Sequence, residues 1–294
     1  MNRGDRREPI LKDDKDRHTF INTLEQACQK TGWQVHAFCL MSHHFHLVVE
    51  TPGGNLAAGM KWFLGTYTSR FNRRHPYDGH VFSGRYKALL VDKSGSGYLK
   101  TLCDYVHLNP VRAKLLQPEQ SLKEYRWSSY REYLSSAEKR ARWMRVDRVL
   151  GEMNIGIDNA AGRREFARRM EASRRNEVSG EYRKIRRGWF YGEETFRREL
   201  LLLASGKLGQ HHYGSEGQET EEDKAQRLIA ADLKRAGWKE AELEQRDKGD
   251  PIKLAVAGRL RAETTLPMKW ICQRLRMGSW KYLNRKLYEL RKRQ

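Results

Sequence analysis

The sequence has few cysteines and no long hydrophobic run. Its four cysteines, Cys28, Cys39, Cys103 and Cys272, are scattered and match neither a zinc-binding spacing nor a disulfide framework. The longest aliphatic run, Leu200–Leu203, is far too short to span a bilayer, and residues 1–5 lack the apolar core of a signal peptide. These absences predict a reduced, soluble, cytoplasmic protein with no membrane partner.

Acidic residues are also scarce relative to basic ones. The chain has 57 Lys and Arg against 37 Asp and Glu, which gives a formal net charge of +20. So strong a positive field favours a polyanionic partner, and we interpret that partner as nucleic acid. The 294 residues leave room for about two domains, and the 38% hydrophobic content suffices for modest cores.

Apolar periodicity predicts an α+β first half, in the order helix, strand, strand, helix, strand, helix. This order is typical of helices packed over an antiparallel sheet. Beyond about residue 140 the charge density rises and strand signals vanish. Residues 209–223 have the composition of a linker, and residues 224–294 are predicted to be helical. The predicted elements of the first half are helix 13–31, strands 33–41 and 44–51, helix 55–74, strand 87–91 and helix 97–109.

Two histidines stand one residue apart inside an apolar run, Met41-Ser42-His43-His44-Phe45-His46-Leu47. In a strand, His44 and His46 project from one face, and Phe45 projects from the other face into a core. Two adjacent imidazoles on a rigid strand make half of a divalent-metal site. Val48 stands where a third alternating histidine would be, which excludes the histidine-triad nucleotide hydrolases.

The predicted helix 97–109 carries the other half of such a site. Tyr105 and Asn109 are four residues apart, so they lie one turn from each other on one helix face. We interpret Tyr105 as a nucleophile for phosphoryl transfer, with a divalent ion held by His44, His46 and the Asn109 amide. Tyr98, two turns earlier, is the competing nucleophile, and we interpret it as a packing residue.

Each of these residues also has a simpler interpretation. His44 and His46 are compatible with ordinary strand positions, because a match to two alternating histidines is weak by itself. Asn109 before Pro110 has the pattern of a helix N-cap with proline at the first helical position. Tyr105 is compatible with a core aromatic residue on a buried helix face.

Several motifs in one order make the chain recognisable. The histidine motif is followed by Tyr105-Val106-His107-Leu108-Asn109-Pro110-Val111-Arg112-Ala113. Together these stretches resemble the REP-associated tyrosine transposases, which are single-tyrosine HUH endonucleases. The resemblance covers about residues 1–135. Further matching stretches are Asn2-Arg3-Gly4, Arg6-Arg7-Glu8, Phe71-Asn72-Arg73-Arg74, Phe82-Ser83-Gly84-Arg85-Tyr86-Lys87-Ala88 and Trp127-Ser128-Ser129-Tyr130.

The resemblance implies a ferredoxin-like catalytic domain that cuts and rejoins single-stranded DNA near hairpins. Tyr105 would form a 5′-phosphotyrosine and leave a free 3′-hydroxyl, while His44, His46 and Asn109 would hold Mg²⁺ or Mn²⁺. The phosphotyrosine conserves the bond energy, so rejoining needs no ATP. The resemblance also implies a bacterial, nucleoid-associated protein, and it favours a monomer although related insertion-sequence enzymes act as dimers.

Two departures from the family pattern stand out. His43 replaces an asparagine that is common before the first histidine, and it is either an extra ligand or a solvated turn residue. Relatives reach the Asn-Arg-Gly segment from a preceding strand, whereas this sequence begins there. We therefore expect either a missed upstream start or a decayed copy, in which the histidine strand lacks a neighbour.

Basic residues around the motifs are predicted to contact DNA phosphates, and Phe82, Tyr86 and Trp127 to stack on unpaired bases. The simpler interpretation is that these charges are solvated and these aromatic residues pack inside. The predicted basic contacts are Arg3, Arg6, Arg7, Arg70, Arg73, Arg74, Arg85, Lys87 and Arg112.

The C-terminal stretch has the pattern of a helix-turn-helix, with helices at 253–263, 267–275 and 279–292. Gly278 lies in the turn, and the last helix would display Ser279, Trp280, Lys281, Asn284 and Arg285 to DNA. A small three-helix bundle produces the same pattern through packing alone. The predicted domains are thus a catalytic domain at 1–135, a basic helical connector and linker at 136–223, and a DNA-binding domain at 224–294.

Two functions compete on this evidence from the residues. The first is a metal-dependent transesterase acting on single-stranded and hairpin DNA. The alternative is a non-catalytic, sequence-specific DNA-binding regulator that uses the C-terminal helix-turn-helix. An RNA-binding module would explain the charge but not the pairing of Tyr105 and Asn109 with the two histidines.

Overall fold

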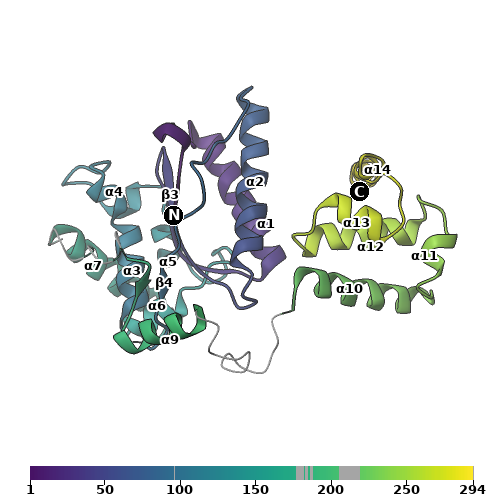
Figure 1. Cartoon of the computed structure of the whole chain (residues 1–294). Coiled ribbons are helices and arrows are strands. Elements are labelled where there is room, and N and C mark those ends of the chain that lie inside the picture. The colour runs from purple at the N-terminus through teal and green to yellow at the C-terminus, as the bar shows by residue number, and fades with distance from the viewer. Residues whose placement is uncertain (96, 177–181, 183–184, 186–187, 205–218, 294) are drawn as a thin grey trace. The chain divides into compact units, whose positions relative to one another are not determined.

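A computed structural model describes residues 1–95, 97–176, 182, 185, 188–204 and 219–293 (Figure 1). Most of the basic run 183–187 and of the predicted linker 209–223 lies outside these residues. The chain divides into two compact units. The first consists of Met1–Glu25, Trp33–Glu50 and Leu64–His212, and the second of Gln26–Gly32, Thr51–Phe63 and Tyr213–Gln294.

The elements before residue 205 confirm the α+β prediction, and the expected helices 13–31 and 55–74 are present within one residue of their predicted ends. Among the described residues, no helix is both long enough and apolar enough to cross a bilayer. In chain order the elements are β1 (Asn2–Arg3), η1 (Asp5–Arg7), α1 (Asp14–Thr31), β2 (Gln34–Leu40), β3 (His44–Glu50), α2 (Leu56–Arg74), β4 (Leu90–Val91), α3 (Tyr98–His107), α4 (Asn109–Arg112), η2 (Leu122–Glu124), α5 (Tyr130–Leu134), α6 (Asp147–Glu152), α7 (Ala160–Arg175), β5 (Phe190–Tyr191) and α9 (Glu194–Ala204).

The main sheet is antiparallel, in the order β1-β3-β2. Its central strand β3 places Phe45 against Phe20 of α1, with ring centroids 4.9 Å apart. His46 projects from the opposite face toward α3. Figure 1 shows α1 and α2 on one side of β3 and α3 on the other. The alternation predicted for this strand therefore separates an apolar face from a histidine face.

Strand β1 covers one end of β3, where the sequence predicts a missing neighbour. Asn2 pairs with Phe45 and Arg3 pairs with His44. On its other side β1 contacts the 81–87 segment, where the Ser83 N–H donates to the Arg3 carbonyl at 2.9 Å. The Asn-Arg-Gly segment is thus itself a short strand, held between the histidine strand and a loop.

The predicted strand 87–91 is shorter than expected and lies elsewhere. Only Leu90–Val91 is extended, and it pairs in parallel with Phe190–Tyr191 in a separate two-stranded sheet. The expectation that strands end before residue 140 is therefore wrong, because β5 follows at 190–191. Two residues are too few to show the alternation by which a strand is recognised.

Residues on both sides of the predicted boundary at 135 contribute to one core. The outer edge of β2 bonds to two later segments: the Leu40 N–H donates to the Trp127 carbonyl, and the Arg145 N–H to the Val35 carbonyl, both at 2.8 Å. Phe166 of α7 is fully buried and stacks on Tyr133 of α5, with ring centroids 4.6 Å apart.

The C-terminal residues confirm the helical prediction. Thr220 and Asp223 form a capping box at the start of α10, and Gly237 ends that helix with φ of 70°. Gly278 has φ of 79° in the predicted turn between the last two helices. The helices are α10 (Glu221–Ala236), α11 (Glu242–Gln245), α12 (Pro251–Glu263), α13 (Met268–Arg274) and α14 (Trp280–Arg293), and their core includes Leu228, Ile229, Leu254, Leu260, Ile271, Leu275, Leu283 and Leu287.

Candidate active site

The two histidines of β3 lie side by side as the alternation predicts. The ring centroids of His44 and His46 are 5.1 Å apart, and the planes meet at 81°. Arg3 pairs with His44 across the strands, so its side chain projects from the same face of the sheet. The histidine face therefore carries two imidazoles and at least one guanidinium group.

Helix α3 brings Tyr105 to the histidines. Its buried face, which includes Leu102, Cys103 and Val106, packs on β2 and β3. The Tyr105 ring then meets His46 edge-on, with centroids 5.5 Å apart. His107 lies two residues after Tyr105 in α3. It is buried and shares a 2.9 Å hydrogen bond with the Ser129 hydroxyl.

Asn109 follows Tyr105 across a helix junction, whereas the sequence predicts one continuous helix from 97 to 109. Helix α3 ends at His107, and α4 begins at Asn109. Pro110 lacks an N–H group and interrupts the ladder of hydrogen bonds. Leu108 keeps φ of −82° and ψ of −1°, so Asn109 still lies about one turn beyond Tyr105.

Within the described residues, Asn109 is largely buried, with 8% of its surface exposed. Its Nδ2 atom and the Nδ1 atom of His44 are buried polar atoms without a hydrogen-bond partner in that part of the chain. Buried polar atoms of this kind normally find a partner, and a ligand or an ion is one explanation for the exceptions.

The environment keeps the histidines uncharged. Burial lowers the pKa of His44 to about 4, and the neighbouring His43 and Arg3 act in the same direction. Burial also lowers the pKa of His46 well below its usual value, and the neighbouring His44 is the second cause of this lowering. Both imidazoles are therefore neutral at pH 7, which is the form that binds a metal ion.

The donor set fits a divalent cation if an amide completes it. Within the described residues, no three His, Cys, Asp or Glu side chains gather into a metal-binding group. His44 and His46 would thus need a ligand of another type, and Asn109 is the one residue of α3 and α4 with a side-chain amide. The third ligand stays a prediction.

Two neighbouring residues have other partners. The His43 ring contacts His44 at 4.7 Å, and its Nδ1 atom lies 3.2 Å from the Ser42 hydroxyl within the turn. The Tyr98 hydroxyl donates to Glu193 at 2.6 Å, which raises the pKa of Tyr98 to about 12. Tyr98 is therefore the weaker candidate nucleophile, and its interpretation as a packing residue stays a prediction.

Arg112 contacts Tyr105 twice. Its guanidinium group donates a hydrogen bond to the Tyr105 main-chain carbonyl. The Cζ atom also lies 4.2 Å from the centroid of the Tyr105 ring and 4.9 Å from that of Tyr182. The sequence predicts a phosphate contact for Arg112. No local sequence pattern indicates that its side chain reaches back to Tyr105, seven residues earlier.

The other basic residues that are predicted to contact DNA phosphates in the first unit fall into two groups. Arg74 forms ion pairs with Asp13 and Asp16, and Arg70 donates to the Thr23 hydroxyl at 2.7 Å. Both residues therefore bind other side chains of the protein. The exposed group is Arg3, Arg6, Arg7, Arg73, Arg85 and Lys87. Among the aromatic candidates, Phe82 packs in the core against Phe45 and Tyr67, while Tyr86 and Trp127 are half-buried.

The last helix of the second unit displays the residues that the sequence predicts. Leu283 and Leu287 face the core, whereas Ser279, Lys281, Asn284 and Arg285 are exposed and Trp280 is 47% exposed. Arg261 of α12 donates to the Asn284 side-chain oxygen at 2.9 Å. Helix α14 thus presents a polar and basic face that carries an oriented amide.

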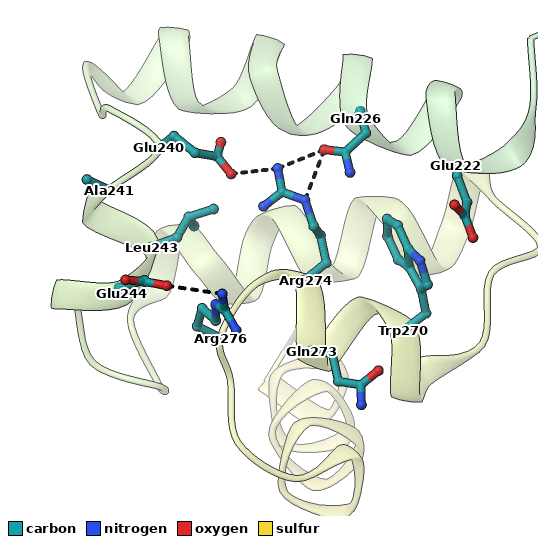
Figure 2. A pocket seen from close by; sticks show the side chains of 10 residues that line it. All are labelled: Glu222, Gln226, Glu240, Ala241, Leu243, Glu244, Trp270, Gln273, Arg274 and Arg276. Carbon is teal, nitrogen blue, oxygen red and sulfur yellow. Dashed lines mark hydrogen bonds and ion pairs between the residues drawn. The ribbon is translucent and has the colours of Figure 1, made fainter.

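Figure 2 shows a cavity of about 600 Å³ within the second unit, lined by α10, α13 and the residues around α11. Arg274 bonds to Gln226 at 2.7 Å and to Glu240 at 2.6 Å, and Arg276 pairs with Glu244 at 3.1 Å. The two guanidinium groups are thus paired with neighbours inside the cavity. None of the site residues that the sequence predicts lines it.

Residues 1–109 match the model of the family described as transposase IS200 like. The matched range includes His44, His46, Tyr105 and Asn109, so this part of the chain is similar to the IS200-like transposases. No curated protein and no solved structure matches the chain.

Proposed function

We propose that the chain is a REP-associated tyrosine transposase, a transesterase that cuts and rejoins single-stranded DNA near hairpins. The observation that carries the proposal is the edge-on contact between Tyr105 and His46, with His44 beside it on the same strand. A tyrosine ring in contact with one of two neighbouring neutral imidazoles brings a nucleophile close to metal ligands, and the family match covers all three residues.

In the proposed step, the Tyr105 hydroxyl oxygen attacks the scissile phosphorus and forms a new P–O bond. The bond from phosphorus to the 3′ oxygen breaks, so the DNA fragment on the 3′ side of the cut remains on the tyrosine through its 5′-phosphate, as a phosphodiester. The phenol proton leaves to solvent, and the departing oxygen takes up a proton to become a 3′-hydroxyl. Attack by that hydroxyl on the phosphotyrosine reverses the step, because one phosphodiester replaces another.

His44, His46 and the Asn109 amide would hold Mg²⁺ or Mn²⁺. A divalent ion bound there would polarise the phosphate and offset its negative charge. The protein residues supply position and counter-charge: β3 fixes both imidazoles, α3 fixes Tyr105, and Arg3 adds positive charge on the same face. Arg6, Arg7 and Arg85 are exposed and available to DNA phosphates.

We further propose that α12–α14 form a helix-turn-helix that binds DNA through α14. The exposed Lys281, Asn284 and Arg285 support this reading, because cationic and amide side chains contact phosphates and base edges. The same face favours the second candidate function, a DNA-binding regulator without catalysis. The two functions differ in whether Tyr105 becomes linked to DNA.

The test incubates the full chain with Mn²⁺ and labelled single-stranded DNA that carries a hairpin. We expect a covalent protein–DNA adduct that survives denaturation and disappears in Tyr105→Phe. Tyr98→Phe is the matched control, since it removes a hydroxyl from the same helix, and it should keep the adduct. Equal DNA binding without an adduct in any variant would refute catalysis and favour the regulator.

A further inference from the structure

We propose that Arg112 is a positioning residue that fixes the Tyr105 side chain for attack, in place of the phosphate contact that the sequence predicts. The inference rests on the proposed function of Tyr105 as the nucleophile. Three contacts carry it: one hydrogen bond to the Tyr105 main chain and the stacking of one guanidinium group over the Tyr105 and Tyr182 rings.

The hydrogen bond fixes the backbone at the nucleophile. Tyr105 belongs to the last turn of α3, whose carbonyl groups lack the N–H donors that a continuing helix would provide. Pro110 adds to this shortage because it has no N–H group. The guanidinium group of Arg112 donates to the Tyr105 carbonyl and so acts as a cap for the end of the helix.

The stacking fixes the ring. The Arg112 Cζ atom lies 4.2 Å from the Tyr105 centroid, while the His46 ring meets Tyr105 edge-on at 5.5 Å. The Tyr182 ring lies 5.4 Å from that of Tyr105, and its own centroid is 4.9 Å from the same Cζ atom. Three groups therefore border the Tyr105 ring, so the movement of its hydroxyl is restricted.

A planar guanidinium group suits both tasks at once. It stacks on aromatic faces and still donates in its own plane, whereas a lysine ammonium is a compact charge without a flat surface. We call Arg112 and Tyr182 together the clamp. Loss of the clamp would allow the Tyr105 hydroxyl to move out of line with the scissile phosphorus. Misplacement by about 1 Å can lower a rate about 100-fold.

The test separates rate from binding. Single-turnover adduct formation is measured at saturating hairpin DNA with Mn²⁺, and DNA affinity is measured separately over a range of salt concentrations. Arg112→Lys keeps the charge, so we expect a rate about 10- to 100-fold lower with unchanged affinity and salt dependence. Arg85→Ala, which removes an exposed charge, should weaken DNA binding and reduce the salt slope of the affinity by about one.

Tyr182 provides an internal check. Tyr182→Phe keeps the ring and should retain the rate, whereas Tyr182→Ala removes one wall and should lower it. Weaker DNA binding in Arg112→Lys or Arg112→Ala on the scale of Arg85→Ala, or an unchanged rate in both Arg112 variants, would overturn the proposal. An adduct that persists in Tyr105→Phe would instead refute the proposed function itself, so the two failures are distinguishable.

Discussion

Lowering the pH from 7 to 5 should leave Mn²⁺ binding at the histidine site almost unchanged. Protons compete with the metal for an imidazole, so affinity falls once the pH drops below the pKa of the free ligand. Burial has already lowered the pKa of His44 to about 4 and that of His46 well below its usual value. At pH 5 a histidine of pKa about 4 is still about 90% neutral, which costs less than a factor of two.

Two ordinary histidines would behave differently. With a pKa of about 6.5, each would be about 76% neutral at pH 7 but only about 3% neutral at pH 5, so the two together would weaken binding by about 600-fold over this range. Manganese titrations followed by electron paramagnetic resonance at pH 7, 6 and 5 distinguish these cases, with His44→Ala as the variant that should lose the site. A loss of more than 100-fold with a midpoint near pH 6.5 would refute the reasoning.

Three further outcomes follow from the packing. Gly4→Ala should lower the free energy of unfolding by about 1–3 kcal/mol in denaturant titrations, because the added Cβ would clash with the Glu8 carbonyl oxygen. Gly151→Ala, in open space in α6, should not destabilise the protein. Burial lowers the pKa of His107 to about 3, so the unfolded chain binds one more proton than the folded chain between about pH 3 and 6.5. The free energy of unfolding should therefore fall as the pH drops through this window, and it should fall less steeply in His107→Gln. Arg285→Ala should weaken duplex DNA binding and reduce its salt slope by about one, as a band-shift series would show.

The histidine strand and the tyrosine helix can be predicted from the sequence, because the apolar residues of each recur over several residues with the period of a strand or of a helix. Phe45 against His44 and His46 shows the two-residue period of a strand, and the structure places them on opposite faces. The IS200-like match supports the transposase prediction. The ferredoxin-like arrangement, the helix-turn-helix and the metal ligands stay predictions.

What the sequence missed depends on short elements and distant contacts. Strands β1, β4 and β5 have two residues each, which is too short for a periodic signal. The apolar pattern continues through Pro110, so the helix break could be placed only by the missing N–H group. The sequence predicts a phosphate contact for Arg112 because its charge is visible there, whereas the return of its side chain to Tyr105 is a property of the folded chain.

The most direct test of the central claim is to locate the DNA linkage by mass spectrometry of the trypsin-digested adduct. Cleavage after Lys93, Lys100 and Arg112 separates Tyr98 in peptide 94–100 from Tyr105 in peptide 101–112, and Tyr182 falls in peptide 176–183. We predict a nucleotide joined through its 5′-phosphate to Tyr105 in peptide 101–112. A linkage in either other peptide would contradict the assignment of Tyr105 as the nucleophile.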